Sequence, residues 1–319
     1  SNESSGAVCD HLLTPSIKDT AQALWLIYLG LTVVCALLYF AFGMSAFDAI
    51  SHSLSTVSIG GFSTHDESIG YFNSISIEVI CMVFMLLSAL SYALHYFAVY
   101  KKKPLKYFHD SELRFFVSIL SIIISLSLLL SIIVGFDGGS FREILFQSVS
   151  IVTTTGFVST DYSSWPASIT FLLLIGAFIG ACSGSVGGGI KSWRVLIMIN
   201  HAKINIMRLV HPNAVVSLKI GSKAVDDKVA ESVWGFFSIY VICFMLLLLS
   251  LLATGMDFES SFSAIGACLN NLGPGLGQVA ETYGSVSNFG KSILALAMIL
   301  GRLEIFTLLV LFTTVFWQK

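Results

Sequence analysis

The sequence predicts an all-α integral membrane protein built from repeated helix–pore-loop–helix units around a central pore. Two observations lead to this fold class. Hydrophobic residues make up 55% of the 319 positions and charged residues only 11%, and a soluble protein of this length could not bury so much apolar surface. In addition, a short polar turn containing glycine recurs three times at matched spacing.

The membrane spans are predicted from six stretches that carry few or no charges. Each is long enough for the roughly 20 residues that cross a bilayer as a helix. We therefore expect six spanning helices and three shorter segments that dip into the membrane and return. The six stretches are residues 21–43, 79–100, 115–136, 162–190, 232–256 and 292–318, the last interrupted only by Arg302 and Glu304.

The orientation follows from the charged residues between these stretches. Lysines and arginines gather between the second and third stretches and between the fourth and fifth, whereas the other connections hold mostly aspartates and glutamates. By the positive-inside rule the basic connections are cytoplasmic, and the glycine turns face outward. The formal net charge of −2 hides this polarity.

The three turns align on Gly61, Gly156 and Gly273, and the apolar run before each begins 41 residues upstream of its glycine. A segment too short to span, starting near an acid, precedes each turn: residues 47–57, 142–152 and 259–269. An acid favours the positive N-terminal end of a helix dipole, so the negative C-terminal end would lie at the turn, where it favours a cation.

Backbone that is not helical at membrane depth is tolerated only where it is buried in protein or lines water. Rings of backbone carbonyls can replace the hydration shell of potassium. The turns therefore predict ion permeation, although each could also be a re-entrant loop that only packs the bundle, and three at matched spacing disfavour that alternative. The candidate filter residues are Ser58, Ile59, Gly60, Gly61, Thr153, Thr154, Thr155, Gly156, Asn270, Asn271, Leu272 and Gly273.

A ring of carbonyls around an ion normally needs four such loops, and the chain supplies three. We expect a first unit either upstream of Ser1 or from another chain. The predicted organisation is a cytoplasmic segment (1–19), the second pore unit (20–100), a cytoplasmic loop (101–114), the third pore unit with a Gly-rich break in its second helix (115–200), a cytoplasmic segment (201–231) and the fourth pore unit (232–319).

A second site follows from the repeat spacing. Arg302 lies 29 residues after its glycine, and the same distance after Gly156 falls on Ser185, so both should lie at one depth below the turns. An arginine in a span almost always faces a protein interior or cavity, and a Gly-rich run cannot hold a regular helix. We interpret these residues as a gate. The alternatives are a structural pair with Glu304 for Arg302 and a packing kink for the run. The candidate loop residues are Ser183, Gly184, Ser185, Gly187, Gly188 and Gly189.

These motifs together resemble the Trk/Ktr/HKT superfamily of potassium transporters, and most closely its bacterial TrkH-type membrane subunits. The residues that carry the resemblance are 60–66, 153–157, 180–191, 270–275 and 301–304. The resemblance implies potassium-channel-type units, of which three of four are present here. It also implies a filter that passes potassium better than sodium, and a loop that gates the pore.

The same resemblance implies the surroundings of the protein. It would form a homodimer in the lipid of the bacterial inner membrane, and a cytoplasmic TrkA-type regulatory ring would dock on its basic loops. NAD or ATP would bind that partner, because no nucleotide motif is visible in this chain. Potassium is then the only expected ligand, and no nucleic acid is expected as a partner.

Two other classes of function remain open at this stage. A sodium- or proton-coupled potassium symporter would also use broken helices, but the chain offers no pair of acids in the membrane as a proton relay, since Glu78 and Glu304 are isolated. A non-conducting scaffold or an enzyme is disfavoured by the three turns. No nucleophile–base pair or metal cluster suggests catalysis, so the chain is not expected to be an enzyme.

Overall fold

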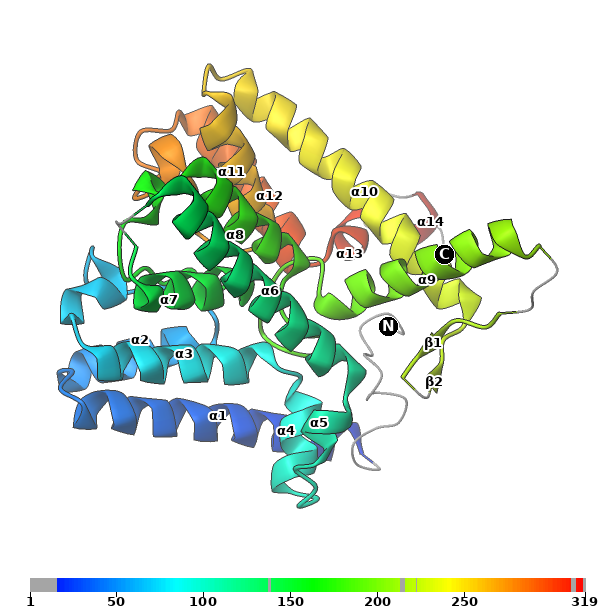
Figure 1. Cartoon of the computed structure of the whole chain (residues 1–319), viewed down its shortest axis with the longest axis horizontal. Coiled ribbons are helices and arrows are strands. Elements are labelled where there is room, and N and C mark those ends of the chain that lie inside the picture. The colour runs from blue at the N-terminus through cyan, green and yellow to red at the C-terminus, as the bar shows by residue number, and fades with distance from the viewer. Residues whose placement is uncertain (1–15, 137–138, 213–215, 222, 311–313, 318–319) are drawn as a thin grey trace.

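The computed structural model describes residues 16–136, 139–212, 216–221, 223–310 and 314–317, and these are predominantly helical (Figure 1). The helices form three consecutive repeats. The N-terminal repeat contains α1 (Ile17–Ala41), α2 (Ala46–Val57), the 3₁₀ turn η1 (Ser68–Phe72), α3 (Ile75–Ala89), α4 (Tyr92–Val99) and α5 (Lys106–His109).

The middle and C-terminal repeats follow the same order. The middle repeat contains α6 (Ser111–Val134), α7 (Phe141–Val152), η2 (Tyr162–Ser164), α8 (Ala167–Ile179) and α9 (Ser192–Val210). A two-stranded antiparallel hairpin of β1 (Lys219–Ile220) and β2 (Lys223–Ala224) follows it. The C-terminal repeat contains α10 (Asp227–Leu252), α11 (Phe258–Leu269), η3 (Gly277–Val279), α12 (Asn288–Arg302), α13 (Ile305–Val310) and α14 (Thr314–Trp317).

The short helices α2, α7 and α11 coincide to within one residue with the segments predicted to dip into the membrane. Each begins at a residue whose side chain accepts a backbone N–H of the first turn: Ser45, Ser140 and Asp257. Such caps satisfy amide groups that have no partner within the helix. At Ser140 the Glu143 side chain also accepts the backbone N–H of the cap residue, which completes a capping box.

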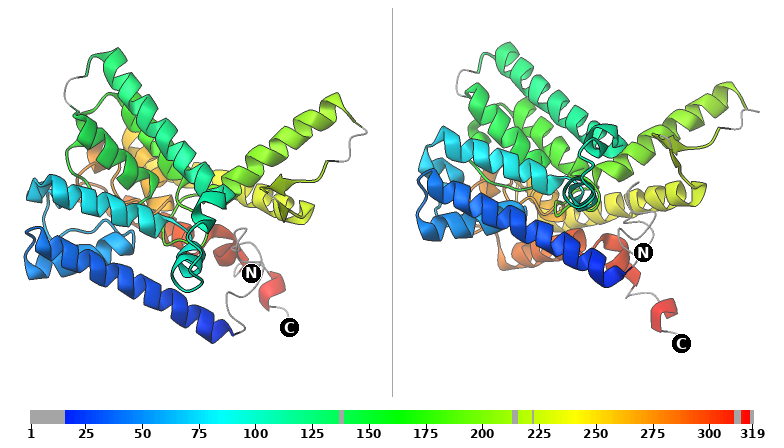
Figure 2. Two further views of the ribbon diagram at one scale, coloured as in Figure 1. Left: turned by 60° about the horizontal axis from the view of Figure 1, so that its bottom comes forward. Right: turned by 90° about the horizontal axis from the view of Figure 1, so that it is seen from below.

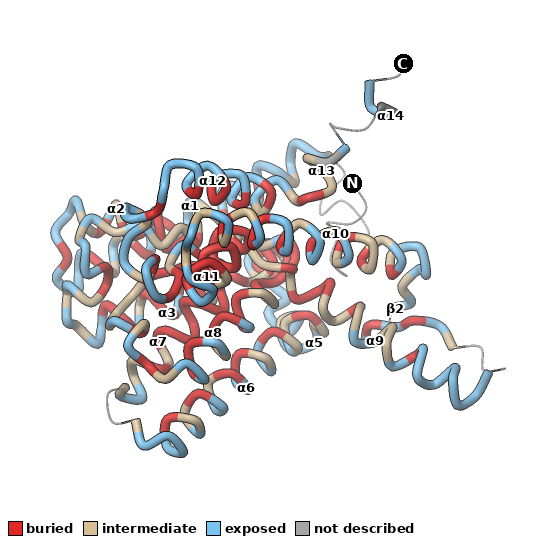
Figure 3. Tube along the Cα trace, turned by 90° about the horizontal axis from the view of Figure 1, so that it is seen from above, coloured by how far each residue is buried: buried red, intermediate tan, exposed pale blue. Residues whose placement is uncertain are grey.

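Three helices of the described part are long and apolar enough to cross a membrane, namely α1, α6 and α10. Much of their apolar surface is exposed in the chain by itself (Figure 3), as expected for helices that face lipid. The other three predicted spans are not continuous helices. The second bends by 98° between α3 and α4, the fourth is helical only over α8, and the sixth is interrupted between α12 and α13.

The buried side chains form two main clusters, which join neighbouring repeats. One combines residues of the N-terminal and middle repeats, and the other is built mainly on α10, α11 and α12. From the middle of the molecule, α9 and the hairpin extend away from the body together with the first turns of α10 (Figure 2). A third cluster, which includes Trp193, Ile197 and Leu218, ties this arm together. The body thus brings the C-terminal ends of α2, α7 and α11 into one region.

Candidate functional site

The three turns after α2, α7 and α11 have the same backbone geometry. In each, the third residue donates its N–H over 2.8 Å to a carbonyl of the preceding helix: Gly60 to Ser55, Thr155 to Ser150, and Leu272 to Ala267. The second residue is left-handed in every turn, with φ of 54° at Ile59, 62° at Thr154 and 55° at Asn271. The aligned glycines also have positive φ, 68°, 86° and 104° at Gly61, Gly156 and Gly273. Left-handed backbone is unfavourable for residues other than glycine, so its recurrence shows that the surrounding structure constrains all three turns in the same way.

The turns lie side by side in chain order. A Cβ atom on Gly61 would overlap the carbonyl oxygen of Thr155, and one on Gly156 would overlap that of Leu272. A Cβ on Gly273 would meet no atom within 4 Å. The middle turn is fully buried between its neighbours, with Thr154 at 0% exposure. The turns therefore form an arc that is open on one side, between the N-terminal and C-terminal repeats.

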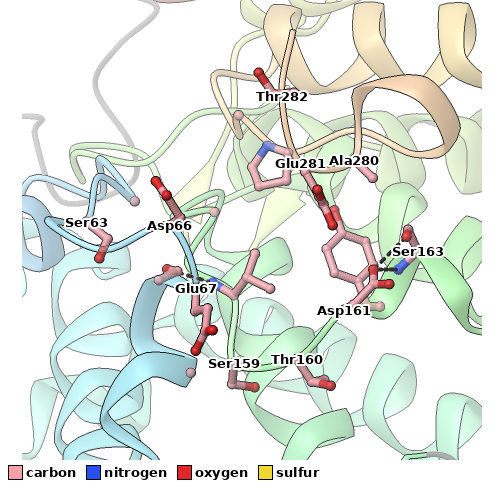
Figure 4. Close-up of a pocket in the computed structure, with 18 of the residues that line it drawn as sticks. Ser63, Asp66, Glu67, Ser159, Thr160, Asp161, Ser163, Ala280, Glu281 and Thr282 are labelled. Carbon is pink, nitrogen blue, oxygen red and sulfur yellow. Dashed lines mark hydrogen bonds between the residues drawn. The ribbon is translucent and has the colours of Figure 1, made fainter. Parts of the chain in front are cut away.

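A cavity of about 920 Å³ lies on the outer side of this arc and is lined by all three glycines. Four carboxylates from the three repeats surround it (Figure 4): Asp66, Glu67, Asp161 and Glu281. Clefts lined by charges of one sign raise the local concentration of the opposite ion. The arrangement therefore attracts cations to the outer face of the turns.

A second cavity, of about 710 Å³, occupies the open side of the arc. Its walls are Ser58–Phe62 of the first turn, Asn271–Pro274 of the last turn, and the face of α12 down to Arg302. Phe62 stands beside it with 79% of its side chain exposed. This cavity separates the first turn from the last.

The Gly-rich segment, residues 180–191, lies directly against the inner side of the turns. The N–H of Gly188 donates to Oγ1 of Thr154 over 2.7 Å. A Cβ on Gly188 would overlap the carbonyl oxygen of Asn270, and one on Gly187 would lie 3.0 Å from that of Thr153. Only glycine permits such close backbone approach. We call this segment the inner loop.

The structure brings Arg302 to the inner loop, as the repeat spacing predicts for its depth. Its guanidinium donates to the carbonyl oxygen of Val186 over 3.2 Å. Glu304, the alternative partner, instead forms an ion pair of 3.0 Å with Arg194. The described ion pairs thus do not support the interpretation of Arg302 as the partner of Glu304.

Sequence reasoning missed two charged residues that touch the inner loop, Lys191 and Glu112. Lys191 donates to the carbonyl oxygens of Gly187 and Ser185, and Glu112 accepts the N–H of Ser183. In the sequence Lys191 counts as one of many basic residues beyond the fourth span, and Glu112 stands beside the charged 101–114 loop. For Lys191 the available signal was its position next to the glycine run. For Glu112 it was the position near the start of an apolar span.

Sequence reasoning also missed three tyrosines that hydrogen-bond to the turns or to the ends of the short helices before them. Tyr39 of α1 hydrogen-bonds to Thr56 over 2.9 Å, and Tyr240 of α10 donates to Oδ1 of Asn270 over 2.8 Å. Tyr283 donates to the carbonyl oxygen of Gly273 over 2.7 Å. The first two bonds join α1 and α10 to the ends of α2 and α11, and the third joins the loop before α12 to the last turn.

The comparisons with known proteins agree with this geometry. The family model of TrkH, a cation transport protein, matches residues 1–319. The chain belongs to the TrkH family. This is a family of transporters, so the prediction that the chain is not an enzyme is confirmed.

Three relatives define the similarity. The Trk system potassium uptake protein TrkH of Halomonas elongata is 51% identical over 98% of this chain, and that of Escherichia coli K12 is 46% identical over 99%. The crystal structure of the potassium transporter TrkH from Vibrio parahaemolyticus superposes with a TM-score of 0.90 at 47% identity, over 96% of this chain and 66% of that one. The chain spans 66% of the length of each of these relatives. The resemblance inferred from the sequence motifs is confirmed at the level of the family.

Proposed function

We propose that this chain carries three of the four filter turns of a potassium uptake pore. The observation that supports this most directly is the arc of three turns with one backbone geometry, each at the C-terminal end of a short helix. The turns lie at the negative ends of three helix dipoles. Their backbone carbonyl groups and these dipoles together favour a dehydrated cation. The relatives named as potassium uptake proteins point to potassium as that cation.

In this proposal the ring is completed by a first unit that fills the open side of the arc. The three turns differ in sequence, with Ile59–Gly60, Thr154–Thr155 and Asn271–Leu272 in equivalent places. Such a filter has low symmetry and fewer matched ligands than a fourfold ring. We therefore expect it to prefer potassium over sodium by a modest ratio.

The inner loop and Arg302 form the gate in this proposal. The inner loop lies against the inner side of two turns, where it would obstruct an ion leaving the filter. Arg302 adds a positive charge at the same level, which raises a barrier to cations. Permeation is then passive, down the electrochemical gradient, whenever the loop moves away.

The remaining features of the proposal concern the surroundings of the chain. The helices α1, α6 and α10 are long and apolar enough to cross a membrane. We propose the bacterial inner membrane, with the arm of α9 and the hairpin on the cytoplasmic side. The printed name "Trk system" of the relatives points to a complex of several components. We propose a homodimer with a TrkA-type ring that binds NAD or ATP.

The alternative is a symporter coupled to protons or sodium. The two acids that the sequence offers as an isolated proton relay are each paired with an arginine: Glu78 with Arg142 over 3.1 Å and Glu304 with Arg194. Potassium flux that follows an imposed proton or sodium gradient would favour the symporter.

The filter is tested by potassium and sodium flux in proteoliposomes with the complete transporter and its Gly156→Ser variant. The added Cβ would overlap the Leu272 carbonyl and approach Pro274 Cδ to 2.9 Å, so we expect the potassium preference to fall by about tenfold, the effect of roughly 1.4 kcal/mol. The matched control is Gly135→Ser, where φ is also positive but no atom lies within 4 Å. An unchanged ion preference in Gly156→Ser would show that the turns only pack the bundle.

The gate is tested in the same assay by Arg302→Ala. Removal of the charge and of its bond to Val186 should raise potassium flux about tenfold, because a hydrogen bond from a charged group contributes roughly 1.5 kcal/mol or more. The ion preference should not change, since the bond of Arg302 is to the inner loop. Flux equal to or below that of the parent protein would remove Arg302 from the gate.

A further inference from the structure

The inner loop is anchored by charged side chains as well as by its own backbone. It joins α8 and α9 over twelve residues, 180–191. Neighbouring backbone supplies some contacts, because Cys182 donates to the Ala89 carbonyl over 3.0 Å and Tyr92 donates to the Gly184 carbonyl over 3.1 Å. Two further contacts come from an ammonium and a carboxylate.

Lys191 is the last residue of the inner loop, and its side chain turns back over the loop. Its Nζ donates to the carbonyl oxygens of Gly187, at 2.7 Å, and Ser185, at 3.3 Å. The backbone of Lys191 has φ 79° and ψ 112°, a conformation that suits glycine. Strained backbone of this kind persists only where surrounding contacts hold it. The two bonds of the ammonium are such contacts.

Glu112 reaches the inner loop from the other end. It lies in the first turn of α6, is 5% exposed, and accepts the backbone N–H of Ser183. A buried carboxylate is unfavourable unless it is hydrogen-bonded, so this bond stabilises both the carboxylate and the position of the loop. Hydrogen bonds with one ionised partner are about twice as strong as neutral ones.

We propose that Lys191 and Glu112 are positioning residues that latch the inner loop in its closed conformation, one at each end of the glycine run. Lys191 holds the segment Ser185–Gly187, which carries the Val186 carbonyl bound by Arg302. Glu112 fixes Ser183 relative to α6. Opening of the pore then requires these bonds to break, and the charges set the fraction of time for which the loop stays closed. The inference rests on the proposed gating function of the loop.

The decisive variant is Lys191→Met, which keeps the length of the side chain and removes the donors. In proteoliposomes with the complete transporter and no regulatory partner, we expect basal potassium flux to rise about tenfold, in proportion to the loss of charge-assisted bonds. The ratio of potassium to sodium flux should stay the same, since the filter is untouched. The control is Lys203→Met, an exposed lysine of the following helix α9. Flux at or below the parent level in Lys191→Met overturns the latch.

A second pair of variants tests Glu112. Glu112→Gln keeps an oxygen that can accept the Ser183 N–H but loses the charge, so flux should rise about twofold. Glu112→Leu removes the acceptor as well and should raise flux severalfold. A purely structural role would instead lower the folded yield of Glu112→Leu without raising flux per folded molecule. Equal flux from the two variants would overturn the role of Glu112.

Amide hydrogen exchange separates this inference from the proposed function. In the complete transporter in detergent, Lys191→Met should increase exchange of residues 180–190 about tenfold and leave α8 unchanged, whether or not any ion is carried. Unchanged exchange overturns the latch even if flux assays support the pore. If exchange increases but neither protein carries potassium, the latch stands as a positioning contact and the proposed function fails.

Discussion

The outer and inner halves of the three repeats differ in how closely they match. In the outer halves, α2, α7 and α11 each have 12 residues, each carries an N-cap, and the three turns share one hydrogen-bond pattern. In the inner halves the second helix of each repeat is broken, but in three ways: a 98° bend after Ala89, the inner loop after Ile179, and a short interruption after Arg302.

These breaks fall near the same place in each repeat, because Leu90, Ser185 and Arg302 all lie 29 residues after their glycines. The proposed function accounts for this difference between the halves. In a potassium filter every turn would have to present the same backbone at the same radius, so the turns would stay alike. A gate would need one obstruction, which a single repeat could supply, so the inner halves would be free to differ.

Of the variants that test this comparison, Gly188→Ala is expected to change basal potassium flux the most. A Cβ there would overlap the Asn270 carbonyl oxygen, so the inner loop could not lie against the turns. We expect basal potassium flux to rise by about tenfold or more, as the closed state loses its packing, with the ion preference retained. The control, Gly235→Ala in α10, adds a methyl group at an ordinary 3.7 Å from Phe306. If Gly188→Ala lost the preference for potassium and did not gain flux, the turns and the inner loop would not act independently.

An intermediate effect is expected from Thr154→Val, which keeps the shape of the side chain but removes the oxygen that accepts the Gly188 N–H. The loss of one hydrogen bond of about 1 kcal/mol should raise flux about fivefold by destabilising the closed loop. Thr170→Val is the matched control, since that buried hydroxyl donates only to its own helix, at Ala167. If Thr154→Val has the same flux as the parent protein, the bond between Gly188 and Thr154 does not stabilise the closed loop.

The smallest effect is expected at the outer caps. The Asp257 carboxylate accepts the backbone N–H of Ser260, which lowers its pKa below the ordinary value of 3.8. The cap therefore stabilises the fold above that ordinary value and loses its effect as the pH falls through the lowered pKa. Asn caps helices equally well and does not titrate.

Asp257→Asn should thus leave the stability of the protein unchanged at pH 7. It should also reduce the loss of stability below pH 3.8, by at most about 1 kcal/mol. Thermal unfolding of the purified protein at pH 7 and below pH 3.8 measures both effects. The Ser140→Ala variant is the reference for a cap without charge, because it should lower stability by a similar amount at every pH. If the stability falls equally on acidification in Asp257→Asn and in the parent protein, the Asp257 cap does not contribute to the pH dependence.

Several elements were predictable from the sequence because their signals are local. The lengths of α2, α7 and α11 follow from an acid near the start and a glycine turn at the end of each short apolar segment. The break at the inner loop follows from its glycines. The bend after Ala89 was not predictable, since Leu90 and Ser91 carry no helix-breaking signal and the conformation depends on contacts with the inner loop, from Tyr92 to Gly184 and from Cys182 to Ala89.

The sequence by itself determined the membrane class of this protein, its three repeated turns and the equivalent repeat positions of Ser185 and Arg302. Hydrophobicity, glycine placement and spacing are signals that act over short distances along the chain. Only the tertiary structure decided that the turns lie in an arc with one open side, that Thr154 binds the inner loop, and that Lys191 and Glu112 anchor it. These contacts join residues from separate elements, and the packing of whole helices places them together.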